Sequence, residues 1–252
     1  MSNAHKSIAI YCQSISLMLT AKKIADQFGF EWMATPPENQ EFYLEYSEQG
    51  LMLHHITEHK SKPLLLDFTQ GKSLYRRLKG GGKNQAIARA IGIKSQYRPV
   101  VIDATAGLAQ DSFVLASLGC EVYLIERSPI IAALLQDALN RASLDNETAG
   151  IIARMHLQYG DAKALIPTLP SADVIYLDPM FPHEKKSALA KKGMQVLQAL
   201  LGESDEDILL DIAINHAKRV VVKRPKTGPF LNDKQPSFQM IGSSNRFDLY
   251  LR

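Results

Sequence analysis

Residues 175–182 carry the clearest potential for chemistry, because an apolar run ends there at Asp178, Pro179 and Phe181. The stretch Asp173–Leu177 is short, largely apolar and bounded by turn formers, so we expect a buried strand of a parallel sheet. Ligands of open α/β sheets bind at the carboxyl ends of such strands. A carboxylate, a rigid backbone carbonyl and an aromatic ring would therefore meet at one candidate active site.

Acidic residues also follow the other strands that we expect in this half of the chain. The strands predicted at residues 100–103, 121–125 and 155–158 end at Asp103, at Glu126 and at Gly160-Asp161. Because the carboxyl ends of parallel strands share one sheet edge, these acids would converge with Asp178. Glu126 stands 23 positions after Asp103, where nucleotide-binding α/β proteins place an acid that accepts ribose hydroxyls. Asp161 would be placed to accept an adenine amino group.

The turn after Asp103 bears on the choice of cofactor. Gly107 alone is a weak signal, since any tight strand-to-helix turn may use a glycine and the three-glycine dinucleotide fingerprint is absent. A pyrophosphate also favours a helix start without nearby negative charge. Here Asp103 and Asp111 would flank the ligand, and they can meet a sulfonium or an ammonium group. The four strand ends together favour S-adenosylmethionine over a nicotinamide cofactor.

The elements that would position these residues alternate between strands and helices from Pro99 onward, which indicates a parallel sheet with crossover helices. We expect helices at 109–118, 129–141, 188–201 and 205–217, a strand at 219–223, and a hairpin of strands at 238–241 and 247–251. Seven strands with a closing hairpin are the layout of a class I (Rossmann-like) methyltransferase, an α/β fold with a mixed sheet. We assign this domain to residues 99–252.

The first part of the chain differs in pattern. Residues 1–70 predict a small α+β domain, with strands at 7–12, 41–47, 51–56 and 64–68 and a helix at 16–28 that Gly29 ends. His54, His55 and His59 suggest a metal, but their segment alternates like a strand, so we predict no metal site. Residues 71–98 predict a basic helical linker in which Gly80–Gly82 form a hinge. The glycine amides would either approach a phosphate or form a plain connection between two helices.

Charge and composition limit the class of protein. The chain of 252 residues has 46% hydrophobic residues, a net charge of +3 and two separated cysteines, which is typical of a globular protein of the cytoplasm. No apolar run approaches the roughly 18 residues of a membrane span. Between Asp67 and Asp103 every charged residue is basic. This segment would attract a polyanion or would simply be a solvated helix face. The candidate RNA contacts are Arg76, Arg77, Lys79, Lys83, Lys185, Lys186, Lys223 and Arg224.

Several motifs of the chain resemble those of known enzymes. The Asp178 motif resembles the Asp/Asn-Pro-Pro-Tyr/Phe motif of methyltransferases that alkylate an exocyclic amino group, with Met180 in place of the second proline. Residues 64–251 closely resemble the bacterial ribosomal RNA small subunit methyltransferase J family, whose members also have methionine there. The segments that carry the resemblance are Asp67-Phe68, Arg76-Arg77 with Gly80–Gly82, Gly92–Lys94, residues 103–108, Asp111, residues 113–117, Glu126-Arg127, residues 176–183, residues 186–189, residues 220–225 and Arg246–Asp248.

The resemblance implies a guanine-N2 methyltransferase that acts on 16S rRNA or the small ribosomal subunit. It places cofactor contacts at Gln110-Asp111, Glu126-Arg127, Gly160-Asp161 and Asp178, although Gln110 stands where family members have arginine and Gly160-Asp161 stand where they have two serines. Asp178 and the Pro179 carbonyl would accept hydrogen bonds from the amine, and Phe181 would stack on the base. Two alternatives remain: an adenine-N6 or protein-amide methyltransferase, and a non-catalytic RNA-binding protein. The sequence predicts no oligomeric state.

Overall fold

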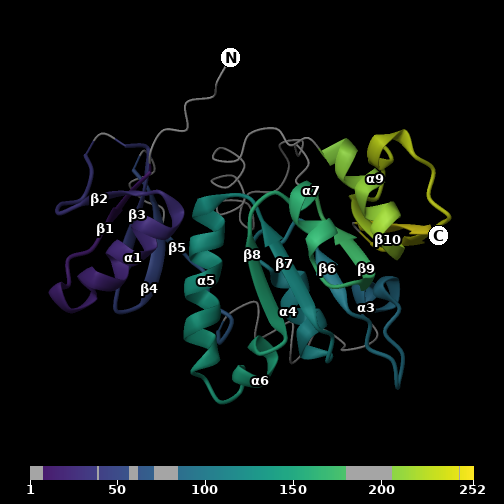
Figure 1. Cartoon of the computed structure of the whole chain (residues 1–252), viewed down its shortest axis with the longest axis horizontal. Helices are drawn as coiled ribbons and strands as arrows, with labels where there is room; N and C mark the ends of the chain where they lie inside the picture. The colour runs from purple at the N-terminus through teal and green to yellow at the C-terminus, as the bar shows by residue number, and fades with distance from the viewer. Residues whose placement is uncertain (1–7, 39, 57–61, 71–84, 180–205, 244) are drawn as a thin grey trace.

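The computed structural model describes residues 8–38, 40–56, 62–70, 85–179, 206–243 and 245–252 (Figure 1). Two sheets lie side by side in the molecule. One has five strands in the order β2-β1-β3-β4-β5, and the other has seven strands in the order β11-β12-β10-β9-β6-β7-β8. Within the described residues, no helix is both long enough and apolar enough to cross a bilayer.

The larger sheet has a parallel core. Its parallel strands are β6 (Val101–Asp103), β7 (Val122–Glu126), β8 (Met155–Tyr159), β9 (Ala172–Leu177) and β10 (Ala217–Pro225). β12 (Asn245–Leu251) runs antiparallel to β10, and β11 (Phe238–Ile241) runs antiparallel to β12. The mixed seven-stranded sheet with a closing hairpin is therefore confirmed. The strand order reverses at β6, since β7 lies on one side of β6 and β9 lies on the other.

Helices cover both faces of this sheet, which explains why its strands are apolar on both sides. Side chains such as Val101, Val174 and Val221 pack on one face with residues of α3 (Ala86–Ile91), α4 (Gln110–Ser117) and α6 (Ala149–Ile152). Ile102, Ile175 and their neighbours pack on the other face. The elements on that face are α7 (Ala162–Leu165), the 3-10 helices η3 (Ile166–Thr168) and η4 (Leu231–Asp233), and α9 (Glu206–His216).

The smaller sheet has the predicted α+β character. Its strands are β1 (Ala9–Tyr11), β2 (Glu31–Met33), β3 (Phe42–Ser47), β4 (Gly50–His55) and β5 (Leu64–Leu65). The 3-10 helix η1 (Ile15–Leu17) leads into α1 (Met18–Phe28), which ends at Gly29 with a left-handed φ of 74°. The strand predicted at 64–68 is shorter than expected, and β2 was not predicted at all.

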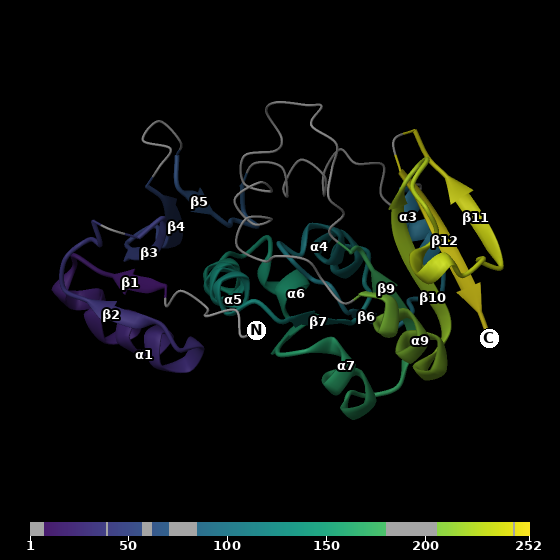
Figure 2. The same cartoon turned by 90° about the horizontal axis from the view of Figure 1, so that it is seen from above.

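The helix α5 (Pro129–Ser143) lies between the two sheets (Figure 2). Ile130, Ala133 and Leu134 pack in the core of the smaller sheet, whereas Leu135 and Ala138 pack in the core of the larger one. A helix that is apolar all round is expected to be buried on all sides. Ser128 caps α5 by accepting a hydrogen bond from the Ile131 N–H, and Pro129 occupies its first turn.

The packing differs from the predicted domain boundaries at residues 70 and 98. Leu66 and Phe68 belong to the core of the larger sheet, where the Phe68 ring stacks on Phe113 with the centroids 4.9 Å apart. Ile87 and Ile91 of α3 are buried in the same core. The core of the larger sheet therefore includes residues that we had assigned to the N-terminal domain and to the linker. Residues 71–84, with the predicted glycine hinge, lie outside the described residues.

Candidate active site

The carboxyl ends of the five parallel strands bring together most of the predicted site residues. In spatial order the edge runs from Lys223 in β10 through Asp178 after β9, Asp103 in β6 and Glu126 in β7 to Asp161 after β8. Asp111 joins them from the first turn of α4. The strand order reverses between these residues, and open α/β sheets bind ligands at such a point.

Glu126 anchors the loop that follows β6. The Gly107 N–H donates to Glu126 Oε2 at 2.9 Å, and the Ser128 N–H donates to Oε1 at 2.7 Å. Gly107 has a φ of 51° and Ala109 a φ of 50°, so the loop turns tightly before α4. Burial raises the pKa of Glu126, although the two backbone N–H groups oppose this shift. Each carboxylate oxygen keeps a second lone pair, with which it can accept a ribose hydroxyl.

Asp103 is a buried acid, with 2% of its surface exposed. The Ser112 hydroxyl donates to Oδ2 and the Thr105 N–H donates to Oδ1 at 3.2 Å. Burial nevertheless raises the pKa of Asp103 to about 7, because desolvation of the carboxylate outweighs these hydrogen bonds. A nearby positive charge would favour the ionised form. The position therefore suits a cationic ligand.

A cluster of four polar side chains joins α4 to the ends of β9 and β10. Lys223 Nζ lies 2.8 Å from Asp111 Oδ2 and 2.7 Å from Asp178 Oδ2. The Tyr176 hydroxyl donates to the same oxygen of Asp111 at 2.7 Å. Burial raises the pKa of Tyr176 well above its ordinary value, and the nearby acids raise it further. Tyr176 therefore acts as a neutral donor to Asp111.

The backbone of Asp178 is fixed by a hydrogen bond to the loop after β6. Its N–H donates to the Thr105 hydroxyl at 2.6 Å, which ties the end of β9 to the loop after β6. Pro179, the next residue, is buried. The predicted stacking residue Phe181 lies outside the described residues. So do the predicted RNA contacts Arg76, Arg77, Lys79, Lys83, Lys185 and Lys186.

The remaining predicted cofactor residues lie along the same edge of the larger sheet, which we call the rim. Gln110 is the first residue of α4 and is half-buried, and Arg127 is exposed just after β7. The Gly160 N–H donates to the Glu126 carbonyl at 2.9 Å. Asp161 is exposed and caps α7 by accepting from the Lys163 N–H at 2.9 Å.

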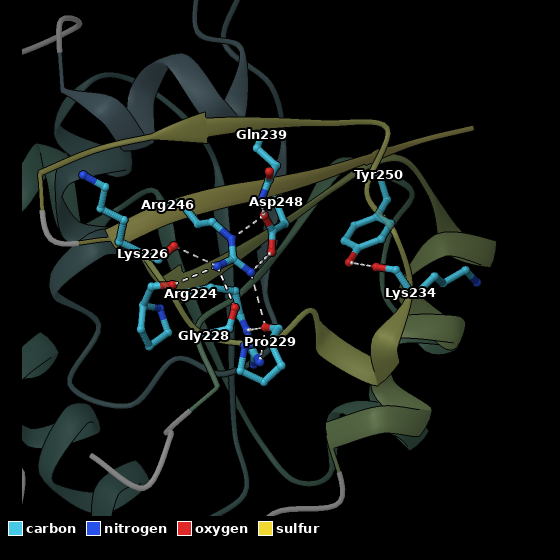
Figure 3. Close-up of polar contacts among 10 residues, drawn as sticks. Arg224, Lys226, Gly228, Pro229, Lys234, Gln239, Arg246, Asp248 and Tyr250 are labelled. Carbon is cyan, nitrogen blue, oxygen red and sulfur yellow. Dashed lines mark hydrogen bonds and ion pairs between the residues drawn. The ribbon is translucent and has the colours of Figure 1, made fainter. Parts of the chain in front are cut away.

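Two of the predicted RNA contacts lie differently from our expectation. Arg224 is only 3% exposed, and its Nε donates to the Pro229 carbonyl at 2.9 Å (Figure 3). A side chain so buried cannot reach an RNA backbone, and we withdraw Arg224 from the candidate contacts. The Lys223 ammonium group contacts Asp111 and Asp178, as described above.

The sequence analysis did not identify Thr105, Ser112 and Tyr176 as site residues. Thr105 lies two residues before Gly107 and Ser112 lies five residues after it, so the only available signal was that polar residues occur near that glycine. Tyr176 was assigned to a buried strand, and nothing in the local sequence indicates its bond to a residue 65 positions away.

The chemistry of this rim fits S-adenosylmethionine. Glu126 offers oxygens to a pair of ribose hydroxyls, and the acids Asp103, Asp111 and Asp178 suit a ligand with a sulfonium and an ammonium group. Within the described residues there is no group of three or more His, Cys, Asp or Glu side chains arranged to hold a metal ion. His54 instead contacts Glu45 at 2.7 Å, and His55 contacts Glu41 at 3.6 Å.

Comparisons with known proteins agree with this chemistry. Residues 23–252 match the family model described as "Putative SAM-dependent methyltransferase". The chain is 50% identical over 234 residues to the ribosomal RNA small subunit methyltransferase J of Pseudoalteromonas translucida, which covers 91% of this chain and 92% of the relative. It is 46% identical to the protein of the same name from Psychromonas ingrahamii, with 97% and 96% covered.

A solved structure shows the same arrangement. The crystal structure of a SAM-dependent methyltransferase from Neisseria gonorrhoeae superimposes with a TM-score of 0.76 at 37% sequence identity. The similarity covers 96% of this chain and 95% of the other.

Proposed function

Because this chain belongs to the ribosomal RNA small subunit methyltransferase J family of SAM-dependent methyltransferases, we propose that it methylates the exocyclic N2 of a guanosine in 16S rRNA. The observation that carries this proposal is the position of Asp178. It directly follows β9 and lies on the same sheet edge as Asp103 and Glu126. The acceptor amine and the methyl donor would thus bind at adjacent strand ends.

Different residues of the rim would contact different parts of the cofactor. Glu126 would accept the ribose hydroxyls, Asp161 the adenine amino group, and Asp103 and Asp111 would face the positively charged end. Gly107, Gln110, Arg127 and Gly160 would complete the contacts. When bound, S-adenosylmethionine supplies an activated methyl group on a positively charged sulfur.

Asp178 and Pro179 would prepare the acceptor. Guanine N2 is a weak nucleophile because its lone pair is delocalised into the ring, so the site must hold the amine in line with the methyl group. The Asp178 carboxylate and the Pro179 carbonyl would accept hydrogen bonds from its two N–H groups and localise the lone pair, while Phe181 would stack on the base. As the N–C bond forms and the S–C bond breaks, the amine loses one proton to Asp178 or to water.

The substrate would be bound through its phosphates. Arg76, Arg77, Lys79, Lys83, Lys185 and Lys186 flank the site in the sequence, and their charges would contact the RNA backbone without reading bases. The binding of substrate would therefore weaken as the salt concentration rises. Since ribosomal subunits are cytoplasmic, we place the protein in the cytoplasm.

The proposed function can be tested with subunits that lack the modification. The purified protein would be incubated with labelled S-adenosylmethionine and unmodified small subunits, and the labelled nucleotide would be mapped and identified. We expect one N2-methylguanosine in 16S rRNA. Parallel reactions with naked 16S rRNA, DNA and ribosomal protein separate the alternatives. A label on adenine N6 or on a protein amide would contradict the proposal and support the first alternative. Cofactor-independent RNA binding without methyl transfer would contradict it and support the second.

A further inference from the structure

The Lys223 side chain pairs with two acids and does not point outward as an RNA contact would. Its side chain is 26% exposed at the end of β10, and its ammonium group lies between Asp178 and Asp111 at 2.7 and 2.8 Å. The two carboxylates come from different parts of the sheet edge, one directly after β9 and the other from the first turn of α4. Lys223 therefore links Asp178, the acid proposed to hold the amine, to α4, the helix that follows the loop after β6.

We propose that Lys223 is a positioning residue for methyl transfer, which orients the Asp178 carboxylate toward the amine and couples it to Asp111 on the cofactor side. This inference rests on the role that we proposed for Asp178. It replaces the RNA contact predicted for Lys223 from the sequence.

The geometry explains why Asp178 needs such a partner. Its side chain is 38% exposed, so an isolated carboxylate there would be well hydrated and could rotate between conformers. The Lys223 ammonium fixes one oxygen, and the backbone N–H bond to Thr105 fixes the main chain. An error of about 1 Å in the position of a reacting group can lower a rate by about 100-fold. Orienting Asp178 is therefore a sufficient reason for Lys223 to affect turnover.

The second contact keeps Lys223 in place. Asp111 Oδ2 accepts hydrogen bonds from both the Lys223 ammonium and the Tyr176 hydroxyl. Tyr176 is 1% exposed and lies in β9, two residues before Asp178. Because the buried tyrosine fixes Asp111, and Asp111 fixes Lys223, the orientation of Asp178 depends on a rigid part of the sheet.

Lys223 acts only as a donor in this arrangement. Burial alone would lower the pKa of Lys223, but the charges of Asp178 and Asp111 outweigh it and raise the pKa above its ordinary value. The ammonium therefore stays protonated at working pH and cannot take the proton that the amine releases. That proton goes to Asp178 or to water.

Lys223 also sets the charge of the site. With the ammonium present, the two carboxylates and Lys223 carry a net charge of −1, and without it they carry −2. A more negative site favours a cation. Loss of the ammonium should therefore strengthen binding of S-adenosylmethionine, which has a sulfonium, relative to S-adenosylhomocysteine, which has a neutral sulfur. A purely structural role would change both affinities equally.

The experiment compares Lys223→Gln and Lys223→Arg with Lys218→Gln. Lys218 is an exposed lysine near the start of the same strand, so its substitution removes an equal charge far from the site. Turnover and KM would be measured with unmodified small subunits, the affinities for the two ligands by calorimetry, and folding by thermal unfolding.

We expect K223Q to lower kcat by about 10- to 100-fold with the KM for subunits changed less than threefold. The ratio of the two affinities should shift at least threefold toward S-adenosylmethionine. The kcat of K223R should be at least tenfold higher than that of K223Q, because a guanidinium can also bridge two carboxylates. K218Q should match the unaltered protein in all these measurements.

Several results would overturn the inference. They are unaltered kcat in K223Q, a change confined to the KM for subunits, or an equal loss of affinity for both ligands. If K223Q does not fold, K223R decides, and a folded K223R protein with less than one hundredth of normal turnover rejects the role. The calorimetry uses no RNA, so it remains decisive if mapping shows that the methyl acceptor is not guanine N2.

Discussion

The Gly107 N–H donates a hydrogen bond of 2.9 Å to Oε2 of Glu126, which joins the loop after β6 to the end of β7. We expect Glu126→Gln to weaken binding of S-adenosylmethionine by about 10-fold or more, since hydrogen bonds to a charged acceptor contribute roughly 1.5–3 kcal/mol. Calorimetry measures the affinity directly. Glu121→Gln serves as the control because Glu121, just before the other end of β7, is exposed. Equal affinities in the two variants would contradict the role of Glu126.

Asp178 offers the most direct test of the chemistry. Asp178→Ala should abolish methyl transfer, lowering the rate by at least about 100-fold, while thermal unfolding shows that the fold is retained. Asp211→Asn removes an exposed carboxylate of α9 and should leave the rate unchanged. Full activity in D178A would remove Asp178 from the mechanism.

The buried acid Asp103 makes stability depend on pH. Its pKa is raised from 3.8 to about 7 in the folded protein, so between these values the folded state binds more protons than the unfolded state. The contribution of Asp103 to the free energy of unfolding therefore falls as pH rises through this range and is constant above it. At 1.36 kcal/mol per pKa unit, the loss between pH 5 and pH 8 is roughly 2–3 kcal/mol.

Asp103→Asn isolates this effect. The variant cannot ionise, so it should gain roughly 2–3 kcal/mol relative to the unaltered protein between pH 5 and pH 8. Urea unfolding at several pH values gives both free energies. A constant difference across the range would show that Asp103 does not titrate there.

Arg246 and Asp248 form a deeply buried ion pair, with 5% and 0% of their side chains exposed, and the pair supports the chain that leaves β10. Arg246 Nε and Nη2 donate to the two oxygens of Asp248 at 2.9 and 3.0 Å. Its remaining hydrogen bonds go to backbone carbonyls of Pro225, Lys226, Gly228 and Pro229 (Figure 3). Arg246→Met would leave a buried carboxylate without this partner, and we expect it to destabilise the fold by about 3–5 kcal/mol.

The exposed pair of Lys234 and Asp211 is the matched control for this prediction. Its atoms are also 2.9 Å apart, but both side chains are about half exposed. Lys234→Met should therefore cost less than about 1 kcal/mol. Urea unfolding of both variants would decide, and similar losses in R246M and K234M would contradict the importance of burial.

Much of the larger sheet was predictable because its strands are short apolar runs that stop at a carboxylate. Asp103 and Glu126 mark such ends in the sequence, and the structure brings both to the same edge as Asp178. The strand β2 was missed because it has only three residues, all of them at least partly exposed at the edge of a sheet. Periodicity has too little to act on in such a segment.

The environment of the basic residues could not be predicted from charge. Lys223 and Arg224 are neighbours in the sequence, yet one pairs with two acids and the other is buried against the Pro229 carbonyl. The acids that pair with Lys223 come from distant elements, and the Pro229 carbonyl reaches Arg224 only because the chain turns back after β10. The local sequence therefore shows only that two cations are present. Charge patterns indicate a polyanion when the side chains are exposed, and exposure is a property of the tertiary structure.

The position of α5 also determines how this protein can be divided. A fragment without the smaller sheet would turn Ile130, Ala133 and Leu134 toward water, and such an apolar stripe drives self-association. Because the helix completes both interiors at once, melting of either half should remove support from the other. The enzyme should therefore unfold in one cooperative transition on heating, and residues 1–70 should not fold as an independent module.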